Sequence, residues 1–367
     1  MNIIFWQNCL SPHQIPYIKE LVRDQRINRI ILIAPVRVLS EREKMGWHNY
    51  STLDGIEIII APTVSEIKRI FFENQDSSIH LFSGIRADRL VYEYFKISLK
   101  YDVKRGLITE SPFVFKARML LHKIRFLLYD YKYVSKIDYV FAMGNTAEDY
   151  YNFWSKKWRV FLFGYCVDVI PNDLPALQSN KMRFVYVGSL TKRKNVSLLL
   201  SSIAHLSSKC DYHLDIIGNG EEHCNLLDFV TKNNLTEHVT FHGTFSMSDI
   251  HAKLINYDVL ILPSIHDGWG AVINEGLQNG LYIISSDACG AITLIENSDR
   301  GVVFKNKDLN SLLEALNYYI KNSKEIKSGR NARLEWSKKI NGEAISKYMI
   351  DCLHNNTLVM PPWKKNS

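Results

Sequence analysis

The sequence of 367 residues lacks the features of membrane-spanning, disulfide-bonded and metal-binding proteins. No apolar run approaches the roughly 20 residues that cross a bilayer, and the first residues have no basic segment of the kind that opens a secretion signal. The six cysteines are scattered without a Cys-x-x-Cys pair, which suits a reducing compartment. The chain has no Asp-x-Asp sequence and no cluster of histidines and cysteines that would ligate a metal ion. We therefore expect a cytosolic protein.

The composition that is present is that of an ordinary globular protein. Apolar residues make up 46% and charged residues 23%, and the length predicts two domains of roughly 150 residues each. The formal net charge of +7 favours polyanions or an anionic membrane surface as partners without choosing between them. No nucleic-acid-binding module is recognisable, so we expect no nucleic-acid partner.

Short apolar segments alternate with polar helical segments in both halves of the chain. In the first half these segments are residues 1–6, 29–34, 56–60, 78–82, 106–109 and 138–143. In the second half they are residues 183–187, 213–217, 239–243, 257–262, 281–285 and 301–304, with Ser248 expected to cap the helix before 257–262. Strands that alternate with helices predict a doubly wound parallel α/β sheet in each half. We place a linker at 171–175, between domains at 1–170 and 171–344.

The most informative stretch is residues 263–280, Pro-Ser-Ile-His-Asp-Gly-Trp-Gly-Ala-Val-Ile-Asn-Glu-Gly-Leu-Gln-Asn-Gly. It follows the pattern of a buried strand and leads into a predicted helix, so that Asp267 lies in the loop at the end of the strand and Glu275 in the helix. Gly268 and Gly270 let backbone N–H groups approach an anion. A nucleotide sugar, with hydroxyls at both ends and a diphosphate between them, fits an anion cradle between two carboxylates.

A cluster of positive charge follows another predicted strand. Gly188 ends that strand, and Lys192, Arg193 and Lys194 precede the next predicted helix. Cations at such a position can neutralise a diphosphate and the charge that it carries as a leaving group. A solvated basic helix start is the alternative interpretation.

Together these residues resemble a known family. The Asp-Gly-Trp-Gly sequence that leads to Glu275 is similar to the acidic-x7-Glu motif of retaining glycosyltransferases with the GT-B fold, in particular glycosyltransferase family 4. The stretch from Gly188 to Lys194 is similar to the Gly-Arg-Leu…Lys-Gly element of that family, with Lys194 in the place of its lysine. The chain departs from the family at Asp267, where glutamate is usual, and at Ser189, where arginine is usual.

The resemblance extends to shorter motifs in the second half. Gly218 and Gly220 are similar to a Gly-x-Gly-x-Glu element at the mouth of the family's donor pocket, although Gly-x-Gly after a strand is more often a plain turn. His242 and Thr244 lie where the family contacts the nucleotide base. The loop that contains Gly290 resembles a loop of the family in which a glycine lets the backbone approach the donor sugar.

The resemblance implies roles for these residues. Glu275 would hold ribose hydroxyls, Asp267 the hydroxyls of the donor sugar, and Lys194 with Arg193 the diphosphate. The phosphate or sugar would also be bound through the backbone N–H groups of Gly268, Trp269 and Gly270. The donor would be a UDP- or GDP-linked sugar, without a further cofactor or a metal ion. Attack would occur on the face that the diphosphate leaves.

The fold implied is GT-B, in which two Rossmann-like domains face a cleft and a C-terminal helix crosses back to the first domain. We assign that helix to about residues 345–367. The first domain would bind the acceptor. His13 and Glu110 follow strands of this domain and are the acceptor-side candidates for catalysis, with purely structural roles as the alternative interpretation.

A basic amphipathic segment at 116–136 has no place in this scheme. As one helix it would have a basic side and an apolar side. The basic side would hold Arg118, Arg125, Lys132 and Lys136, and the apolar side Leu120, Ile124, Leu127, Leu128 and Tyr131. We favour a domain helix with its apolar side in the core and its basic side in water. The alternative is a helix that docks on an anionic membrane.

We expect a metal-independent, retaining hexosyltransferase that acts on a glycan or lipid-linked acceptor in surface polysaccharide assembly, with peripheral contact at the inner face of the cell membrane as a further expectation. Two alternatives stay open. One is a degenerate protein that binds a sugar nucleotide or glycan without catalysis, because Asp267 and Ser189 depart from the family pattern. The other is a non-hydrolysing sugar-nucleotide epimerase, which shares the fold and needs no acceptor.

Overall fold

The computed structural model describes residues 1–43, 46–47, 50–111, 119–154, 157–168, 181–206, 211–355 and 359–365. The chain forms two compact units. Unit 1 is Met1–Asp168 together with Ile340–Asn366, and unit 2 is Val169–Lys339. The predicted linker at 171–175 lies outside the described residues, as does Arg118 of the basic amphipathic segment.

Unit 1 is built on seven parallel strands in the order β3-β2-β1-β4-β5-β6-β7. They are β1 Asn2–Trp6, β2 Arg29–Ala34, β3 Ile56–Ile60, β4 Ser78–Phe82, β5 Lys104–Thr109, β6 Tyr139–Met143 and β7 Arg159–Phe163. The residues of β1, β4 and β6 are almost all buried and, apart from Asn2, Ser78 and His80, apolar, as expected where helices cover both faces of a parallel sheet. The strand order reverses between β1 and β4, which makes this a topological switch point.

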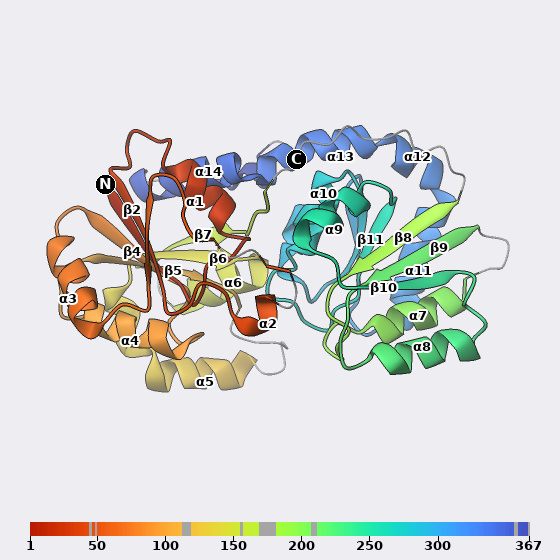
Figure 1. Cartoon of the computed structure of the whole chain (residues 1–367), viewed down its shortest axis with the longest axis horizontal. Helices are drawn as coiled ribbons and strands as arrows, with labels where there is room; N and C mark the ends of the chain where they lie inside the picture. The colour runs from red at the N-terminus through yellow and green to blue at the C-terminus, as the bar shows by residue number, and fades with distance from the viewer. Residues whose placement is uncertain are drawn as a thin grey trace. The chain divides into compact units, whose positions relative to one another are not determined.

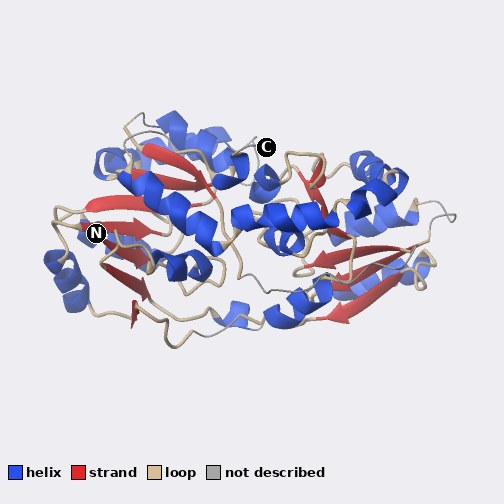
Figure 2. Ribbon diagram, turned by 90° about the horizontal axis from the view of Figure 1, so that it is seen from above, coloured by secondary structure: helices blue, strands red, loops and turns tan. Residues whose placement is uncertain are grey.

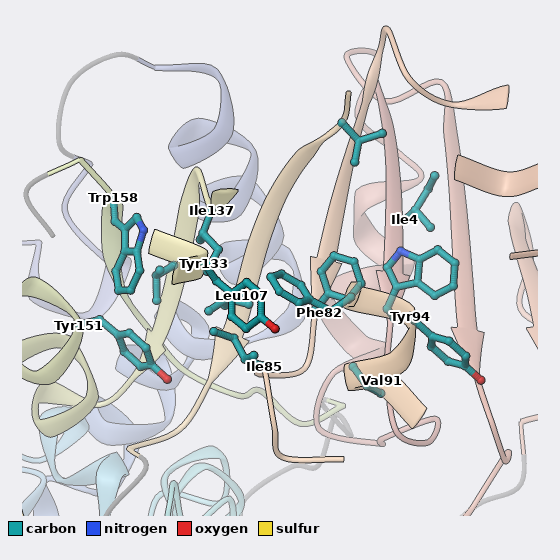
Figure 3. Close-up of a cluster of buried hydrophobic side chains, with 14 of the residues drawn as sticks. Ile4, Phe82, Ile85, Val91, Tyr94, Leu107, Tyr133, Ile137, Tyr151 and Trp158 are labelled. Carbon is teal, nitrogen blue, oxygen red and sulfur yellow. The ribbon is translucent and has the colours of Figure 1, made fainter. Parts of the chain in front are cut away.

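Helices cover both faces of the unit 1 sheet (Figure 1; Figure 2). They are α1 Ile15–Leu21, α2 Ser40–Glu43, α3 Val64–Glu73, α4 Arg89–Ser98, α5 Met119–Tyr129, α6 Asn145–Trp154 and α14 Gly342–His354, with the 3-10 helices η2 Tyr131–Lys136 and η5 Pro362–Lys364. In Figure 1, α3, α4 and α5 lie on one side of the sheet and α1 and α14 on the other. The core under α3 to α6 is rich in aromatic rings, among them Phe82, Tyr133 and Tyr151 (Figure 3).

The helix α14 belongs to unit 1 although it follows unit 2 in the sequence. It packs on α1, and the contact is close because Gly342 has no side chain: a Cβ there would lie 2.6 Å from the carbonyl oxygen of Pro16. The hydroxyl of Tyr348 donates a hydrogen bond of 2.9 Å to the carbonyl of Leu162 in β7. The predicted return of a C-terminal helix to the first domain is confirmed.

Unit 2 repeats the architecture with six parallel strands in the order β10-β9-β8-β11-β12-β13. They are β8 Met182–Val187, β9 Tyr212–Ile217, β10 Val239–Gly243, β11 Val259–Leu262, β12 Tyr282–Ser286 and β13 Gly301–Phe304. The switch point of this sheet lies between β8 and β11. The prediction of a doubly wound parallel sheet in each half is confirmed.

The helices of unit 2 also lie on both faces of its sheet (Figure 1; Figure 2). They are α7 Val196–Ala204, α8 His223–Lys232, α9 Met247–Leu254, α10 Val272–Gln278, α11 Leu309–Lys321, α12 Ser323–Ser328 and α13 Arg330–Ser337, with the 3-10 helices η3 Gly290–Leu294 and η4 Lys338–Ile340. The predicted cap of α9 was wrong by two residues. Ser246, not Ser248, caps this helix, and its hydroxyl oxygen accepts a hydrogen bond of 3.2 Å from the N–H of Asp249.

The short helix α10 is fixed at its C-terminal end by two buried arginines of α13. The guanidinium of Arg330 donates hydrogen bonds to the carbonyls of Ile255 and, at 3.2 Å, of Asn279. Arg333 donates to the carbonyl of Gly280 at 2.9 Å. Cationic donors at the last carbonyls of a helix satisfy acceptors that have no partner within the helix. α13 therefore sets the position of α10, which carries Glu275.

The segment 116–136 departs from the prediction that we favoured. The described part forms two short elements, α5 and η2, instead of one helix. Its apolar side is not in the core, because the side chains assigned to it are between 46% and 71% exposed: Leu120, Ile124, Leu127, Leu128 and Tyr131. The buried side of α5 is held by Phe126 instead. Of the helices that the structure describes, none has the length and apolar character to cross a membrane.

Candidate functional site

The densest group of candidate residues lies in unit 2, at the switch point between β8 and β11. Loops that follow the two strands beside such a point run to opposite faces of the sheet and leave room for a ligand. Lys194 and Arg193 come from the loop after β8, and Asp267 comes from the loop after β11. The structure brings these three side chains together.

The carboxylate of Asp267 lies between two cations. It forms an ion pair with the ammonium of Lys194 and lies 3.6 Å from the guanidinium of Arg193. The side chains of Asp267 and Lys194 are only 15% and 13% exposed, whereas that of Arg193 is 49% exposed. Arg193 also donates a hydrogen bond of 2.7 Å to the carbonyl of His266, and its own carbonyl accepts one from the N–H of Ile265. The two loops are therefore tied together by backbone as well as by charge.

The neighbouring cations keep Asp267 ionised. Burial alone would raise the pKa of this carboxyl, but the charge and hydrogen bond of Lys194, and then the charge of Arg193, bring the pKa below its ordinary value. With two cations for one carboxylate, the three side chains carry a net positive charge that attracts an anion. Within the ranges that the structure describes, no group of three or more His, Cys, Asp and Glu residues is arranged to hold a metal ion.

Close backbone contacts join the loops around this group. A Cβ on Gly218 would lie 1.9 Å from the carbonyl oxygen of Gly188, and a Cβ on Gly290 would lie 2.1 Å from that of Gly268. No other residue could stand at Gly218 or Gly290 without displacing the opposite loop. Gly220 lies against the loop after β8 in the same way. The predicted glycines thus allow two close loop contacts. The loop after β9 packs on the loop after β8, and the loop after β12 packs on the loop after β11.

The loop before α10 offers unpaired backbone donors. In the described part of the chain, the N–H groups of Gly268, Trp269 and Gly270 donate no hydrogen bond, so they are available to an anion. The side chain of Trp269 belongs to the core: it is 2% exposed, and its Nε1 donates a hydrogen bond of 2.8 Å to Oδ1 of Asn274. This anchored ring fixes the loop. Because α10 has only seven residues, the N–H groups of the loop are a better source of positive potential than the helix dipole.

Glu275 lies in the first turn of α10 and is buried. Burial raises the pKa of its carboxyl to about 7. No cation and no hydrogen-bond donor among the described residues offsets that burial. A ligand that donates hydrogen bonds to this carboxylate would favour its ionised form, and a pair of neighbouring hydroxyls is such a ligand.

The side chains of His242 and Thr244 are not joined to this group by any contact among the described residues. Nε2 of His242 lies 2.6 Å from Oδ1 of Asp215 on the neighbouring strand. Thr244 is exposed in the loop after β10. The carbonyl of Gly243 accepts a hydrogen bond of 2.7 Å from the N–H of Gly218. The structure therefore links the backbone of this stretch, and not its side chains, to the loops of the site.

A second site lies in unit 1, at the switch point between β1 and β4. A cavity of about 440 Å³ opens at the carboxyl ends of these strands. It is lined by the loops after β1, β4, β5 and β7 and by α5, with the polar residues Asn8, Arg86, Glu110, Arg125, Asp130 and Tyr165 among them. Arg86 forms an ion pair of 2.5 Å with Asp130, which fixes the side of the cavity next to α5.

The two acceptor-side candidates of unit 1, Glu110 and His13, both lie near Tyr165. Glu110 is exposed in the cavity, and Tyr165, whose pKa is raised by burial and then by the charge of Glu110, lies beside it. The ring of His13 lies 6.1 Å from that of Tyr165 and 5.3 Å, edge-on, from that of Trp47. His13 therefore sits in an aromatic setting next to the cavity that Glu110 lines.

Of the polar residues named in this cavity, only Glu110 was a candidate in the sequence analysis; Asn8, Arg86, Arg125, Asp130 and Tyr165 were missed. Arg86 lies in the loop after β4 and Tyr165 in the loop after β7, so their positions after strands were a usable signal, although Glu110 follows its strand more closely. Arg125 had no such signal, because only the structure shows that α5 covers this edge of the sheet.

Comparison with known proteins shows what the sequence of unit 2 is similar to. Residues 173–339 match the family described as Glycosyl transferases group 1. An uncharacterized glycosyltransferase of Methanocaldococcus jannaschii is 27% identical over 160 residues, 43% of this chain and 44% of the relative, and a second from that organism is matched over 35% of its length. The chain thus spans less than half of these relatives. The O-antigen biosynthesis glycosyltransferase WclY of Escherichia coli is 25% identical over 65% of this chain and 69% of its own.

Solved structures share the fold of the whole chain. The lipopolysaccharide outer core galactosyltransferase WaaB in its apo form matches with a TM-score of 0.70 at 16% identity, over 96% of this chain and 99% of its own. The Anabaena protein HepE in complex with UDP matches with a TM-score of 0.72 at 13% identity, over the same shares. Two doubly wound parallel sheets with a returning helix define a GT-B protein. Within that class, the family match of this chain, to the glycosyl transferases group 1, lies in the sequence of unit 2.

Proposed function

We propose that this protein is a retaining glycosyltransferase of family 4 that moves a hexose from a nucleotide diphosphate sugar to a glycan or lipid-linked acceptor. The observation that carries the proposal is the ion-paired group of Lys194, Arg193 and Asp267 at the switch point of unit 2. The roles that the names of WclY and WaaB give, in O-antigen and lipopolysaccharide biosynthesis, support a role in surface polysaccharide assembly, and the UDP bound to HepE supports a uridine nucleotide. The scattered free thiols suit an enzyme of the cytosol.

In this proposal unit 2 binds the donor. Arg193, which is half exposed, and Lys194 bind the diphosphate from one loop, and the free N–H groups of residues 268–270 bind it from the other. Asp267 holds Lys194 in place and accepts hydrogen bonds from the donor sugar. As the bond to the sugar breaks, negative charge grows on the diphosphate, and fixed cations that need no reorganisation stabilise it. These side chains can balance that charge without a metal ion.

The remaining candidate residues bind the nucleoside of the donor and the acceptor. Glu275 accepts hydrogen bonds from the ribose hydroxyls, which draws its carboxyl into the ionised form. The cavity of unit 1 takes the acceptor, with Glu110 and His13, which both lie near Tyr165, as the groups that orient its hydroxyl. His242 and Thr244 contribute backbone contacts to the base.

The test is a thermal-shift series with UDP, GDP, ADP and CMP in the presence of EDTA. A ligand that binds only the folded state at a hundred times its dissociation constant stabilises it by about 2.7 kcal/mol. We expect one nucleoside diphosphate to raise the Tm of the wild type and to have no effect on Lys194→Ala. Lys192→Ala is the matched control, because Lys192 is an exposed neighbour on the same loop.

The outcome separates the proposal from its alternatives. Transfer of sugar to an added acceptor supports the transferase. Nucleotide binding without any turnover of the sugar nucleotide would favour a degenerate binding protein, and turnover that needs no acceptor would favour an epimerase. If none of the nucleotides shifts the Tm at millimolar concentration, the donor site is wrong.

A further inference from the structure

The helix α5 presents an apolar face to solvent. Five of its side chains are between 46% and 71% exposed: Leu120, Leu121, Ile124, Leu127 and Leu128. Their spacing places all five on one side of the helix. Single exposed apolar residues are normal on protein surfaces, but a contiguous group of this size marks an interaction surface.

The opposite side of α5 is firmly packed. The ring of Phe126, which is 5% exposed, stacks on that of Trp154 with centroids 4.4 Å apart. It also meets the rings of Tyr150 and Trp158 edge-on, at 6.1 Å each. The exposed apolar face therefore belongs to a helix whose rotation is fixed by its buried side.

Positive charge borders the apolar face on both flanks. Arg125 lies on one flank and is exposed. Lys123 lies on the other, with its ammonium 3.5 Å from the centre of the Phe153 ring, which is itself 61% exposed. No aspartate or glutamate occurs from Met119 to Tyr129. Exposed tyrosines, whose rings are amphipathic, stand at the end of the helix and just beyond it, at Tyr129 and Tyr131.

We propose that α5 lies flat on an anionic lipid bilayer. The five apolar side chains would enter the boundary between headgroups and acyl chains, and Lys123 and Arg125 would contact lipid phosphates. The apolar strip of α5 complements the acyl chains of such a bilayer, and the cations beside it complement the anionic headgroups. A protein groove that buried the strip would need no cationic border. With eleven residues, or roughly 16 Å, α5 is too short to cross a bilayer but long enough to lie on it.

Vesicle binding of the full chain, without nucleotide or acceptor, tests this proposal separately from the proposed function. We expect the protein to sediment with vesicles of phosphatidylcholine mixed with phosphatidylglycerol and much less with phosphatidylcholine alone. The triple variant Leu120→Gln/Ile124→Gln/Leu128→Gln should lower the partition coefficient at least about tenfold, because it removes the inserted apolar surface. Lys123→Gln should weaken binding to the mixed vesicles and reduce its dependence on salt.

A matched control changes three exposed apolar residues of unit 2, Leu227→Gln/Val303→Gln/Tyr318→Gln, and should bind vesicles like the wild type. Since the positions in both triple variants are exposed, the Tm of these two variants should stay near that of the wild type, which separates lost docking from lost folding. The proposal is wrong if the wild type ignores the mixed vesicles at low salt, or if the control loses binding as much as the α5 variant. It is also wrong if the α5 substitutions abolish a dimer in solution while vesicle binding persists.

Discussion

Asp267 and Lys194 form a charged pair with little access to water, and such a pair acts more through its geometry than through net stability. Removing one partner leaves the other charge buried and uncompensated, whereas removing both avoids that cost. At the scale of single residues, the site therefore depends on a lysine that stays in position only while its carboxylate is ionised.

A double-mutant cycle measures this dependence. Lys194→Met should lower the free energy of unfolding by about 3 kcal/mol, because it leaves the buried carboxylate of Asp267 with only the half-exposed Arg193, and Asp267→Asn should cost a similar amount, because it leaves the ammonium of Lys194 without its partner. The double variant should lose clearly less than the sum of the two. Arg193→Met, at a half-exposed position, should cost no more than about 1 kcal/mol. Strict additivity in urea unfolding would show that the pair is not formed.

Glu275 makes stability depend on pH. Its pKa is about 7 in the folded protein against an ordinary 4.5, so the folded state binds the proton more tightly than the unfolded state. The stabilisation by that proton is complete below pH 4.5 and is lost as pH rises through 7. At about 1.4 kcal/mol for each unit of pKa, the ionised carboxylate costs the folded state about 3 kcal/mol at pH 8.

The neutral variant Glu275→Gln should therefore be more stable than the wild type at pH 8, by up to about 3 kcal/mol, and nearly equal to it at pH 5. Chemical unfolding at both pH values measures the difference. A difference that does not change with pH would mean that Glu275 does not titrate in this range.

At the scale of elements, the contact of α14 with α1 rests on a glycine. Gly342→Val would place side-chain atoms where the carbonyl oxygen of Pro16 already stands, 2.6 Å from the first added atom. We expect a loss of about 2 kcal/mol and faster proteolysis of the chain after unit 2. Lys347→Val is the control, because it puts the same β-branched side chain on the exposed face of α14. Equal losses in both variants would assign the effect to helix propensity instead.

The elements also show where inference from the sequence succeeds. Strand ends could be predicted, because β-branched runs broken by glycine mark them, and residues after parallel strands gather at one edge of a sheet. This is why Lys194 and Asp267 lie at the same edge of the sheet of unit 2. The orientation of α5 could not be predicted, because an amphipathic pattern defines two faces without saying which is buried. The orientation of α5 is set by Phe126, whose ring packs against those of Trp154 and Trp158, two residues that lie far from α5 in the sequence.

At the scale of the whole molecule, the sequence supports the class of fold and the location of the donor site better than their details. The sheet orders that put the switch points between β1 and β4 and between β8 and β11 rest on long-range pairing, which local patterns do not contain. The ion pair of Asp267 with Lys194, the burial of Trp269 and the cavity beside Glu110 depend on that pairing. Each became visible only in three dimensions.

The return of α14 to unit 1 has a consequence for synthesis on the ribosome. Unit 2 is continuous in sequence, so it can complete its core as soon as it has left the exit tunnel. Unit 1 has emerged earlier, yet α1 has no partner on its outer side until α14 has been translated. In the growing chain, unit 2 can therefore be folded while unit 1 still lacks α14. For that interval the apolar side of α1 is a surface that chaperones can hold.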